Sequence, residues 1–322
     1  MPDSGYAPQY GPSQGFVEIC EAGTRDGLQI ESQIIPAAEK IALVDAMLDS
    51  GIRHVEVTSF VSPRAVPQMA DAEEVLRGIR KRADTNLMAL VPNLRGAERA
   101  LTTPVDGGVL LISASETHNR KNLNRGIDES LESFPAVAAR LRDGGKEVLG
   151  GVAVAFGCPF EGEVDLDGII RIGQVYASLG VRHMTLGDTT GMAAPRNVRR
   201  TLRALRAALP SMEFTMHLHN TRGVGLANVL VSLEEGVRRF DSAAGGLGGC
   251  PFAAGATGNI CTEDLVYLLD ESNWTTGIDL EKSIAVAKRM ETLLGRALPG
   301  QVMRAGPRLR LHAVDAVPTA AG

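Results

Sequence analysis

The segment TMHLHNTRG, residues 215–223, holds two of the six histidines of the chain, His217 and His219, at the end of an apolar run. Side chains along a β-strand alternate between its two faces, so residues two positions apart point the same way. Two imidazoles on one face can bind one cation, although a polar strand end that binds nothing has the same pattern. The choice depends on which other polar residues the fold brings to these histidines.

Polar residues of catalytic type also lie at the ends of other apolar runs. TRDG follows the first run, a glutamate lies within the second, and GDTT follows the sixth. The glycine-rich segment 245–259 follows the last run and carries a cysteine and an asparagine. Each of these groups also fits an ion pair or a turn, so only their convergence would indicate a site. The residues concerned are Arg25, Asp26, Glu56, Asp188, Thr189, Cys250 and Asn259.

The elements that must position these residues are predicted by a repeated alternation of short apolar runs with amphipathic stretches. Eight strand–helix units favour a parallel sheet closed into a (β/α)₈ TIM barrel, an α/β fold. No Gly-x-Gly-x-x-Gly follows the first strand, which disfavours a doubly wound open sheet. The strands are expected at 16–22, 53–59, 86–91, 107–113, 147–156, 182–187, 212–219 and 238–244. The helices are expected at 36–51, 70–82, 94–102, 128–145, 166–180, 195–209, 224–236 and 262–271, with an additional helix at 281–295.

A barrel of this kind places its chemistry at the carboxyl ends of its strands. The first strand, the seventh strand and the loop after the eighth therefore meet at one mouth. Two imidazoles, one carboxylate and an amide oxygen form a mixed nitrogen and oxygen set that suits Mg²⁺, Mn²⁺ or a similar divalent ion. Such a set predicts an enzyme that uses a Lewis-acid metal.

Composition limits the remaining possibilities. The net charge of −5 gives no basic field for nucleic acid, and no apolar run approaches the roughly 20 residues of a membrane-spanning helix, so neither partner is expected. Residues 1–15 do not resemble a signal peptide, and four cysteines are too few for a disulfide scaffold, so we expect a cytoplasmic protein. We predict a flexible arm over 1–15, one catalytic barrel domain with a C-terminal helical extension over 16–297, and a partly disordered tail over 298–322.

Five segments at the expected strand ends carry a resemblance to a known family. They are EAGTRDGLQIE (21–31), EVTSFVSPRAVPQM (56–69), FGCPFEG (156–162), LGDTTG (186–191) and GGLGGCPFAAGATGNICTEDLVYLL (245–269). With these segments the chain resembles the hydroxymethylglutaryl-CoA lyase family, within the metal-dependent barrel aldolases and acyltransferases. The resemblance spans about residues 16–297.

The resemblance implies cleavage of 3-hydroxy-3-methylglutaryl-CoA to acetyl-CoA and acetoacetate, a step of leucine degradation, by a homo-oligomer. It implies a divalent cation, Mg²⁺ or Mn²⁺, on Asp26, His217, His219 and Asn259. Catalytic roles follow for Arg25, for Cys250 on a mobile loop, and for Glu56. The base that accepts the hydroxyl proton is Asp26, His217 or Glu56. Contacts with the acyl-CoA substrate are expected from Arg25, Gln29, Ser59, Asn122 and Thr189.

The chain departs from the family pattern beside the two histidines. Family lyases typically have HCHDTYGQ where this chain has HLHNTRGV, so Asn220, Arg222 and Val224 replace Asp, Tyr and Gln. Arg222 is either a surface residue or a cation that binds an extra anionic group, and the acyl group of the substrate is therefore open. No cysteine follows Cys261, so the C-terminal redox motif of some members is absent.

Coenzyme A is an anion. The loop expected after the fourth strand has a cluster of cations in the segment THNRKNLNR, residues 117–125. Arg120, Lys121 and Arg125 either contact the nucleotide or form a solvated face. Two other functions remain open at this stage. A condensing enzyme of the isopropylmalate-synthase kind shares the Arg-Asp and His-x-His pattern, and a catalytically silent barrel would have lost some of these residues.

Overall fold

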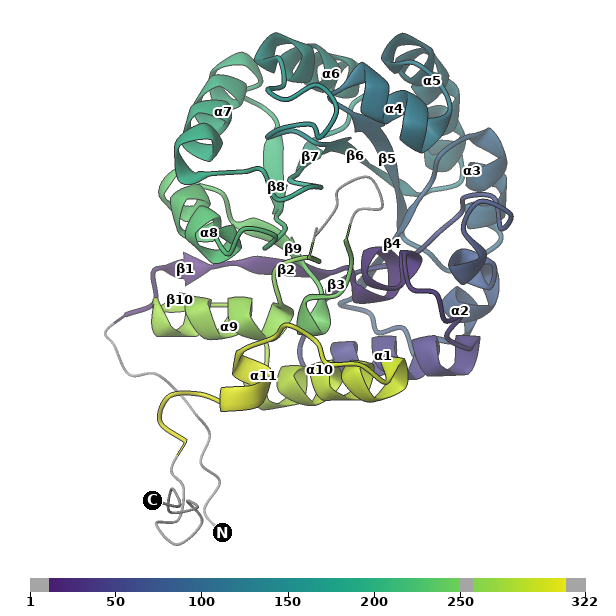
Figure 1. Cartoon of the computed structure of the whole chain (residues 1–322). Helices are drawn as coiled ribbons and strands as arrows, with labels where there is room; N and C mark the ends of the chain where they lie inside the picture. The colour runs from purple at the N-terminus through teal and green to yellow at the C-terminus, as the bar shows by residue number, and fades with distance from the viewer. Residues whose placement is uncertain (1–11, 250–256, 311–322) are drawn as a thin grey trace, which may run out of the picture.

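The computed structural model describes residues 12–249 and 257–310 of the 322-residue chain. Eight parallel strands close into a barrel in chain order, with helices around the outside (Figure 1). The (β/α)₈ fold predicted from the alternation of apolar runs is thereby confirmed. The barrel strands are β2 (Glu18–Glu21), β3 (His54–Ser59), β4 (Asn86–Leu90), β5 (Gly107–Ser113), β6 (Glu147–Ala153), β7 (His183–Gly187), β8 (Glu213–His217) and β9 (Arg239–Ser242).

The helices that cover the barrel follow the strands as expected. They are α1 (Ala37–Asp49), α2 (Ala72–Gly78), α3 (Leu94–Leu101), α5 (Ile127–Asp143), α6 (Leu166–Ser178), α7 (Pro195–Ala208), α8 (Gly225–Glu234) and α9 (Thr262–Glu271). Short helical turns lie at η1 (Gly23–Gly27), η2 (Pro67–Met69) and η3 (Ala244–Gly246). No helix among the described residues is long and apolar enough to span a membrane.

The prediction of a loop at 117–125 is wrong, because most of this segment belongs to helix α4 (Glu116–Leu123). The segment has few apolar residues, so its sequence has no helical periodicity. Both ends of this helix are capped by side-chain and backbone chemistry. The Ser115 hydroxyl accepts a hydrogen bond from the His118 amide, and Asn124 ends the helix in the left-handed conformation with φ of 56°. Caps rather than amphipathicity therefore account for α4.

Several strands end earlier than their apolar runs, among them β6 and β8. The run at 147–156 stays extended only to Ala153, because Val154 turns to a positive φ of 53°. The run at 212–219 gives a strand that ends at His217, and His219 forms an isolated bridge with Asn259. The second difference matters for function, because this bridge joins the histidine pair to the glycine-rich segment.

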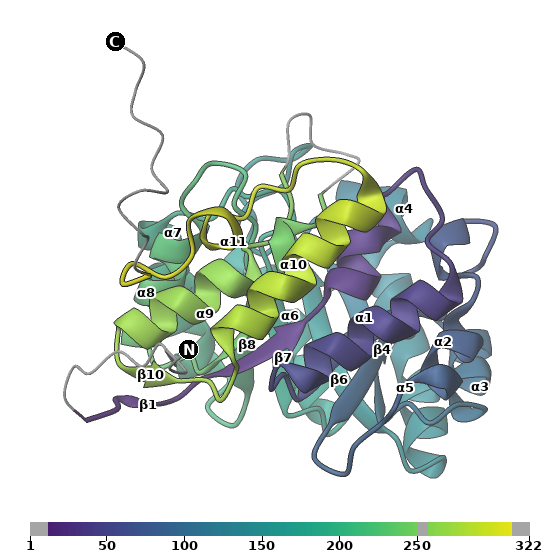
Figure 2. The same cartoon turned by 90° about the horizontal axis from the view of Figure 1, so that it is seen from below.

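The C-terminal extension packs against the first helix of the barrel. Helix α10 (Leu280–Leu294) lies side by side with α1 and α9, as Figures 1 and 2 show from two directions. The Asp279 side chain caps its first turn and Gly295, with φ of 62°, ends it. The short helix α11 (Val302–Ala305) follows, with Val302 and Met303 buried.

The chain ends predicted to be an arm and a tail are described only in part. Residues 298–310 of the predicted tail pack onto the barrel domain through α11. Near the other end, β1 (Gly15–Phe16) pairs in parallel with β10 (Trp274–Thr275). Residues 1–11 and 311–322 lie outside the described part of the chain.

Strand β6 is unusual because it carries two consecutive glycines, Gly150 and Gly151. On one side of the strand, the ring of Tyr176 from α6 fills the space, since a Cβ at Gly150 would lie 2.6 Å from it. The Tyr176 hydroxyl donates to the Leu110 carbonyl oxygen at 2.6 Å and lies 3.0 Å from that of Gly151. Stacking on Phe134 completes the burial of this ring. Tyr176 thus fixes β6 from the outside of the barrel.

We expect Tyr176→Phe to lower the free energy of unfolding by about 1–2 kcal/mol, because the ring still fills the space while the buried carbonyls lose a donor. Urea unfolding followed by circular dichroism measures the change. An unfolding midpoint equal to that of the parent would show that the hydroxyl does not stabilise the fold.

Candidate active site

The Arg-Asp pair lies on a wide turn immediately after β2. In η1 the Gly27 amide donates to the Ala22 carbonyl oxygen at 3.2 Å, a span of five residues that is typical of π-helical turns at functional sites. The buried carboxylate of Glu21 accepts from the amides of Gly23 at 2.8 Å and Ala244 at 3.0 Å. It also accepts from the Thr262 hydroxyl. Glu21 therefore joins the Arg-Asp turn to the segment that follows β9.

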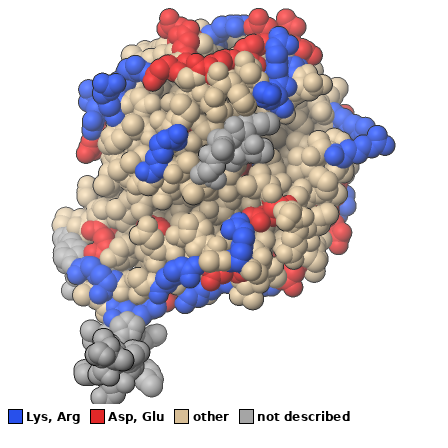
Figure 3. All heavy atoms as spheres, viewed as in Figure 1, with Lys and Arg blue, Asp and Glu red and all other residues tan. Residues whose placement is uncertain are grey.

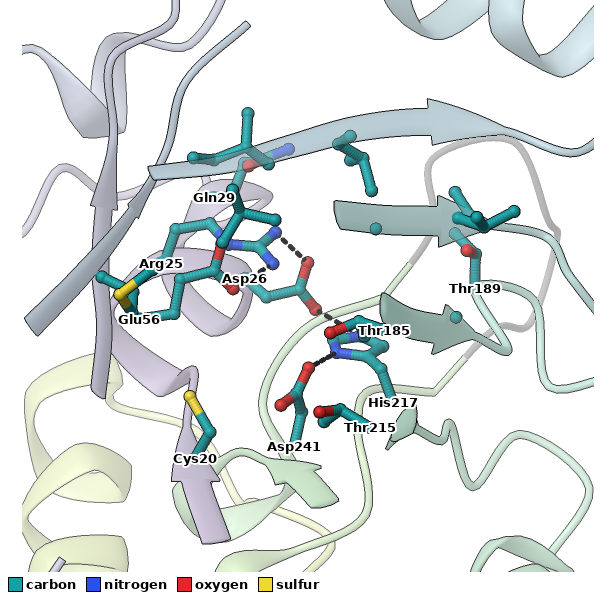
Figure 4. A pocket seen from close by; sticks show the side chains of 18 of the residues that line it. Cys20, Arg25, Asp26, Gln29, Glu56, Thr185, Thr189, Thr215, His217 and Asp241 are labelled. Atoms are coloured by element: carbon teal, nitrogen blue, oxygen red, sulfur yellow. Dashed lines mark hydrogen bonds and ion pairs between the residues drawn. The ribbon is translucent and has the colours of Figure 1, made fainter. Parts of the chain in front are cut away.

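The two histidines meet the aspartate of this turn, as the sequence predicted. The Nε2 atoms of His217 and His219 lie 3.3 Å apart, and each lies 3.8 Å from Asp26 Oδ2. One ligand atom from each of the three residues lies within 4.8 Å of the others, which is close enough for all three to hold one metal ion. Figure 4 shows Asp26 and His217 pointing toward one another at the centre of the pocket.

Asn259 completes this group from the glycine-rich segment. Its Nδ2 donates to Asp26 Oδ2 at 2.7 Å and to the Leu247 carbonyl oxygen at 2.9 Å. These two bonds orient the amide and leave Oδ1 buried with no partner among the described residues. The contact needs a glycine at 248, with φ of 104°, since a Cβ there would lie 2.6 Å from Asn259 Nδ2. An unpartnered amide oxygen beside two imidazoles and a carboxylate fits a divalent cation.

Arg25 stands between two carboxylates. Its guanidinium donates to Asp26 Oδ1 at 2.7 Å and to Glu56 Oε2 at 2.6 Å (Figure 4). Burial alone would raise the pKa of Asp26, but Arg25 and the two imidazoles hold it well below its usual range. Burial raises the pKa of Glu56 despite the same arginine. Asp26 is therefore ionised, while Arg25 Nε and Glu56 Oε1 are buried with no partner among the described residues.

The two histidines have opposite electrostatic surroundings. Burial, reinforced by the neighbouring His217, lowers the pKa of His219 to about 4, so this imidazole is neutral as a metal ligand must be. Burial also acts to lower the pKa of His217, but the carboxylates of Asp241 and Asp26 raise it overall. His217 therefore carries the proton more readily of the two.

Asp241 lies in the site, although it is not among the site residues predicted from the sequence. It lies on β9 in register with His217, and its Oδ2 is 3.2 Å from His217 Nδ1. A carboxylate on Nδ1 fixes the tautomer and directs Nε2 toward a metal. The available signal was a lone aspartate in the apolar run 238–244, next to the strand that bears the histidines.

The expected substrate residues do not all reach the pocket. A cavity of about 440 Å³ runs through the barrel, and Gln29, Asn122 and Thr189 line it together with Asp26, His217 and His219. Ser59 does not line it, because its side chain is fully buried and accepts from the Val61 amide. Cys250 lies outside the described residues, although the preceding Gly249 lines the cavity.

The predicted cationic cluster is divided by its contacts. Lys121 lines the cavity and lies 5.2 Å from the centre of the Phe160 ring. Arg120 instead pairs with Glu116 on the exposed face of α4, and Arg125 donates to the Pro92 carbonyl oxygen. The basic side chains on this face of the molecule form separate groups rather than one continuous patch (Figure 3).

Arg222, which replaces a family tyrosine, has a structural contact. Its guanidinium donates to the carbonyl oxygens of Thr190 at 3.2 Å and Gly191 at 2.7 Å. It therefore holds the segment after β7 against the segment after β8.

The chain is similar to known proteins over most of its length. A family model described as HMGL-like matches residues 16–290, which include all of the site residues described above. The chain belongs to the HMGL-like family. Within this family it is 40% identical to a hydroxymethylglutaryl-CoA lyase of Bacillus subtilis over 88% of this chain and 95% of the relative. It is also 40% identical to a 3-hydroxy-3-isohexenylglutaryl-CoA/hydroxymethylglutaryl-CoA lyase of Pseudomonas aeruginosa, over 87% and 94%.

Solved structures of HMG-CoA lyases are similar to this structure in fold and sequence. An HMG-CoA lyase of Acinetobacter baumannii, solved with coenzyme A and 3-methylmalate, has a TM-score of 0.89 and 42% identity. The match covers 93% of this chain and 98% of that one. The carboxyl transferase domain of Rhizobium etli pyruvate carboxylase, at 17% identity and a TM-score of 0.67, shares the fold alone.

We expect Asp241→Asn to weaken divalent-metal binding about 10- to 100-fold, because His217 loses the carboxylate that orients its Nε2. Isothermal titration with Mn²⁺ measures the affinity without depending on turnover. Asp128→Asn, which alters an exposed ion pair with Arg171, is the matched control. Equal Mn²⁺ affinity in both variants would remove Asp241 from the metal site.

Proposed function

We propose that this chain is a carbon–carbon lyase that cleaves 3-hydroxy-3-methylglutaryl-CoA to acetyl-CoA and acetoacetate. The observation that carries the proposal is the convergence of Asp26, His217, His219 and the unpartnered Asn259 oxygen beside a buried arginine, Arg25. Arg25, Asp26 and the two histidines line a cavity large enough for an acyl group, in a member of the HMGL-like family. Relatives about 40% identical are hydroxymethylglutaryl-CoA lyases by name.

The reaction breaks the bond between the carbon that bears the hydroxyl and the carbon next to the thioester. The hydroxyl proton leaves, the hydroxyl carbon becomes the ketone of acetoacetate, and the bonding electrons pass to the thioester as an enolate. A proton added to the enolate carbon then gives acetyl-CoA. A divalent cation, when bound, acidifies the hydroxyl and stabilises the negative charge of its oxygen. We propose Mg²⁺ or Mn²⁺, the ions that suit this ligand set.

Arg25 is suited to stabilise the enolate oxygen. It is always charged, it is held at a fixed position by Asp26 and Glu56, and its Nε–H has no partner among the described residues. Asp26 is the poorest of the three candidate bases, since its pKa lies well below the usual range. His217 and Glu56 remain candidates for accepting the hydroxyl proton.

Gln29, Asn122 and Thr189 line the same cavity and are proposed to contact the acyl-CoA. Lys121 is the nearest candidate for the charged part of coenzyme A, because it is the member of its cluster that lines the cavity. The homo-oligomeric state and the cytoplasmic location stay predictions from the sequence.

The direct test is an assay of purified protein with 3-hydroxy-3-methylglutaryl-CoA in the presence of Mg²⁺ or Mn²⁺, with acetoacetate as the measured product. Citramalyl-CoA belongs in the same assay, because a relative from Chloroflexus aurantiacus at 40% identity is an (R)-citramalyl-CoA lyase by name. Condensation of acetyl-CoA with 2-oxo acids, without lyase activity, would instead support an isopropylmalate-synthase-like enzyme.

We expect Arg25→Met to lower kcat about a hundredfold or more with a much smaller change in KM, because the arginine acts on charge that develops in the transition state. Steady-state kinetics measure both constants. Arg171→Met, at an exposed position on α6, is the control for loss of a guanidinium. A change confined to KM would make Arg25 a binding residue.

Cys250, in the glycine-rich segment 245–259, is proposed as the proton donor to the enolate, directly or through water. We expect iodoacetamide to inactivate the enzyme through Cys250 and substrate to protect it. Peptide mass spectrometry identifies the alkylated residue. Inactivation that follows alkylation of Cys20, Cys158 or Cys261, with Cys250 unmodified, would contradict this role.

A further inference from the structure

Helix α1 carries a lysine that is buried against the segment following β3. Lys40 is only 2% exposed, whereas lysines are almost never fully buried unless they are paired. Its Nζ donates to the Gln68 carbonyl oxygen and to the two carboxylate oxygens of Asp71, at 2.7 Å and 3.0 Å. A buried ion pair adds little net stability compared with apolar side chains of similar volume. Stability alone therefore does not account for a lysine at this position.

The aspartate that pairs with Lys40 does not cap its own helix. Asp71 occupies the N-cap position of α2, where an aspartate usually accepts a hydrogen bond from an amide of the first turn. Its side chain makes no such bond, and both of its oxygens accept from Lys40 instead. The ammonium thereby ties α1 to the start of α2, and the two helices lie side by side (Figures 1 and 2).

Gln68 extends this link to the segment that follows the Arg-Asp turn. Its side-chain Nε2 donates to the carbonyl oxygen of Glu31, four residues after the end of η1. Its backbone carbonyl oxygen accepts from Lys40. One residue of η2 thus connects the segments after β2 and β3 with α1. Lys40, Gln68 and Asp71 are called the latch below.

The two segments that the latch connects form one side of the mouth of the barrel, because both follow the carboxyl end of a strand. Their cavity-lining residues are Gln29, Ile30, Val61, Ala65 and Val66. Residues 62–65 form only an exposed turn, so their position depends on what holds the ends of the segment. At one end Arg99 donates to the Val61 carbonyl oxygen at 3.0 Å, and at the other end the latch holds Gln68.

We propose that Lys40 is a positioning residue for the acyl-CoA substrate, because through Gln68 it fixes both of these segments before the substrate binds. The inference rests on the proposed lyase function and adds a residue that does not itself line the cavity. A wall that is already ordered binds its ligand without the free-energy cost of ordering it. Lys40 donates to neither Arg25 nor the proposed metal ligands, so it acts on substrate binding and not on bond cleavage.

Lys40→Met tests the latch, because it keeps an unbranched side chain of similar size and removes all three hydrogen bonds. We expect KM for 3-hydroxy-3-methylglutaryl-CoA to rise roughly tenfold, while kcat and the Mn²⁺ affinity stay within about twofold of the parent. Lys146→Met is the matched control. This half-buried lysine donates to the Val105 carbonyl oxygen at 2.7 Å, just before β6 and thus at the opposite end of the barrel, and its loss should leave KM unchanged.

Gln68→Ala is the second variant, because it removes the bond to Glu31 and leaves the ion pair of Lys40 with Asp71 intact. KM should rise in this variant too, and it carries the test should Lys40→Met fold poorly. A parental KM in the folded variants, even with a lower unfolding midpoint, would make the latch purely structural and overturn the inference. A fall in kcat as large as the rise in KM would also overturn it.

Failure of the parent enzyme to cleave 3-hydroxy-3-methylglutaryl-CoA would overturn the proposed function separately. The affinity for coenzyme A, measured by isothermal titration, then decides the role of the latch. Weaker binding by Lys40→Met than by Lys146→Met would support the positioning role. Equal affinity in the parent and in both variants would overturn it.

Discussion

The carboxylate of Asp26 is the group on which the rest of the site depends. It is an ionised side chain of which only 17% is exposed, and such a group is tolerated only when positive charge and hydrogen-bond donors surround it. Arg25 supplies the charge at 2.7 Å, and the Asn259 amide supplies a donor at 2.7 Å. These partners come from the two ends of the barrel domain, residues 25 and 259, and closure of the barrel between β2 and β9 brings them together. The site therefore cannot form before the fold is complete.

The buried carboxylate of Glu21 fixes the position of the turn that carries Asp26. It accepts amides from both the Arg-Asp turn and the segment after β9, so the two segments that carry Asp26 and Asn259 share one anchor. Burial raises the pKa of Glu21 to about 7 against these hydrogen bonds. The hydrogen bonds offset part of the cost of burying this carboxylate. They also fix the positions of the two segments that carry Asp26 and Asn259.

The parts of the fold that follow simple periodicity could be predicted from the sequence. Eight alternations of apolar runs and helices were sufficient for the barrel, and the rule that strand ends meet at one mouth brought Asp26 to His217 and His219. Two features were out of reach for a physical reason. Helix α4 is defined by the caps at Ser115 and Asn124 rather than by an apolar face. Asp241 acts through its strand register with His217, and register is a property of the assembled sheet.

The distinction between a side chain that lines the cavity and one that supports it was also beyond the sequence. Ser59 and Thr189 both lie at strand ends, yet only Thr189 reaches the cavity. The direction of a side chain at a strand end depends on the residue at which the strand stops. In β6 the strand stops at Ala153, because Val154 turns to a positive φ of 53°.

The two glycines of β6 let side chains of neighbouring elements pack closely against both faces of the strand. Gly150 is compensated, because the Tyr176 ring fills its space and the Tyr176 hydroxyl donates to the Leu110 carbonyl oxygen of the neighbouring strand β5. Gly151 is compensated from the inside of the barrel, because Leu111 Cδ1 lies 3.0 Å from where its Cβ would be. Close packing is thereby kept on both faces of β6, although the strand itself contributes no side chain at either position.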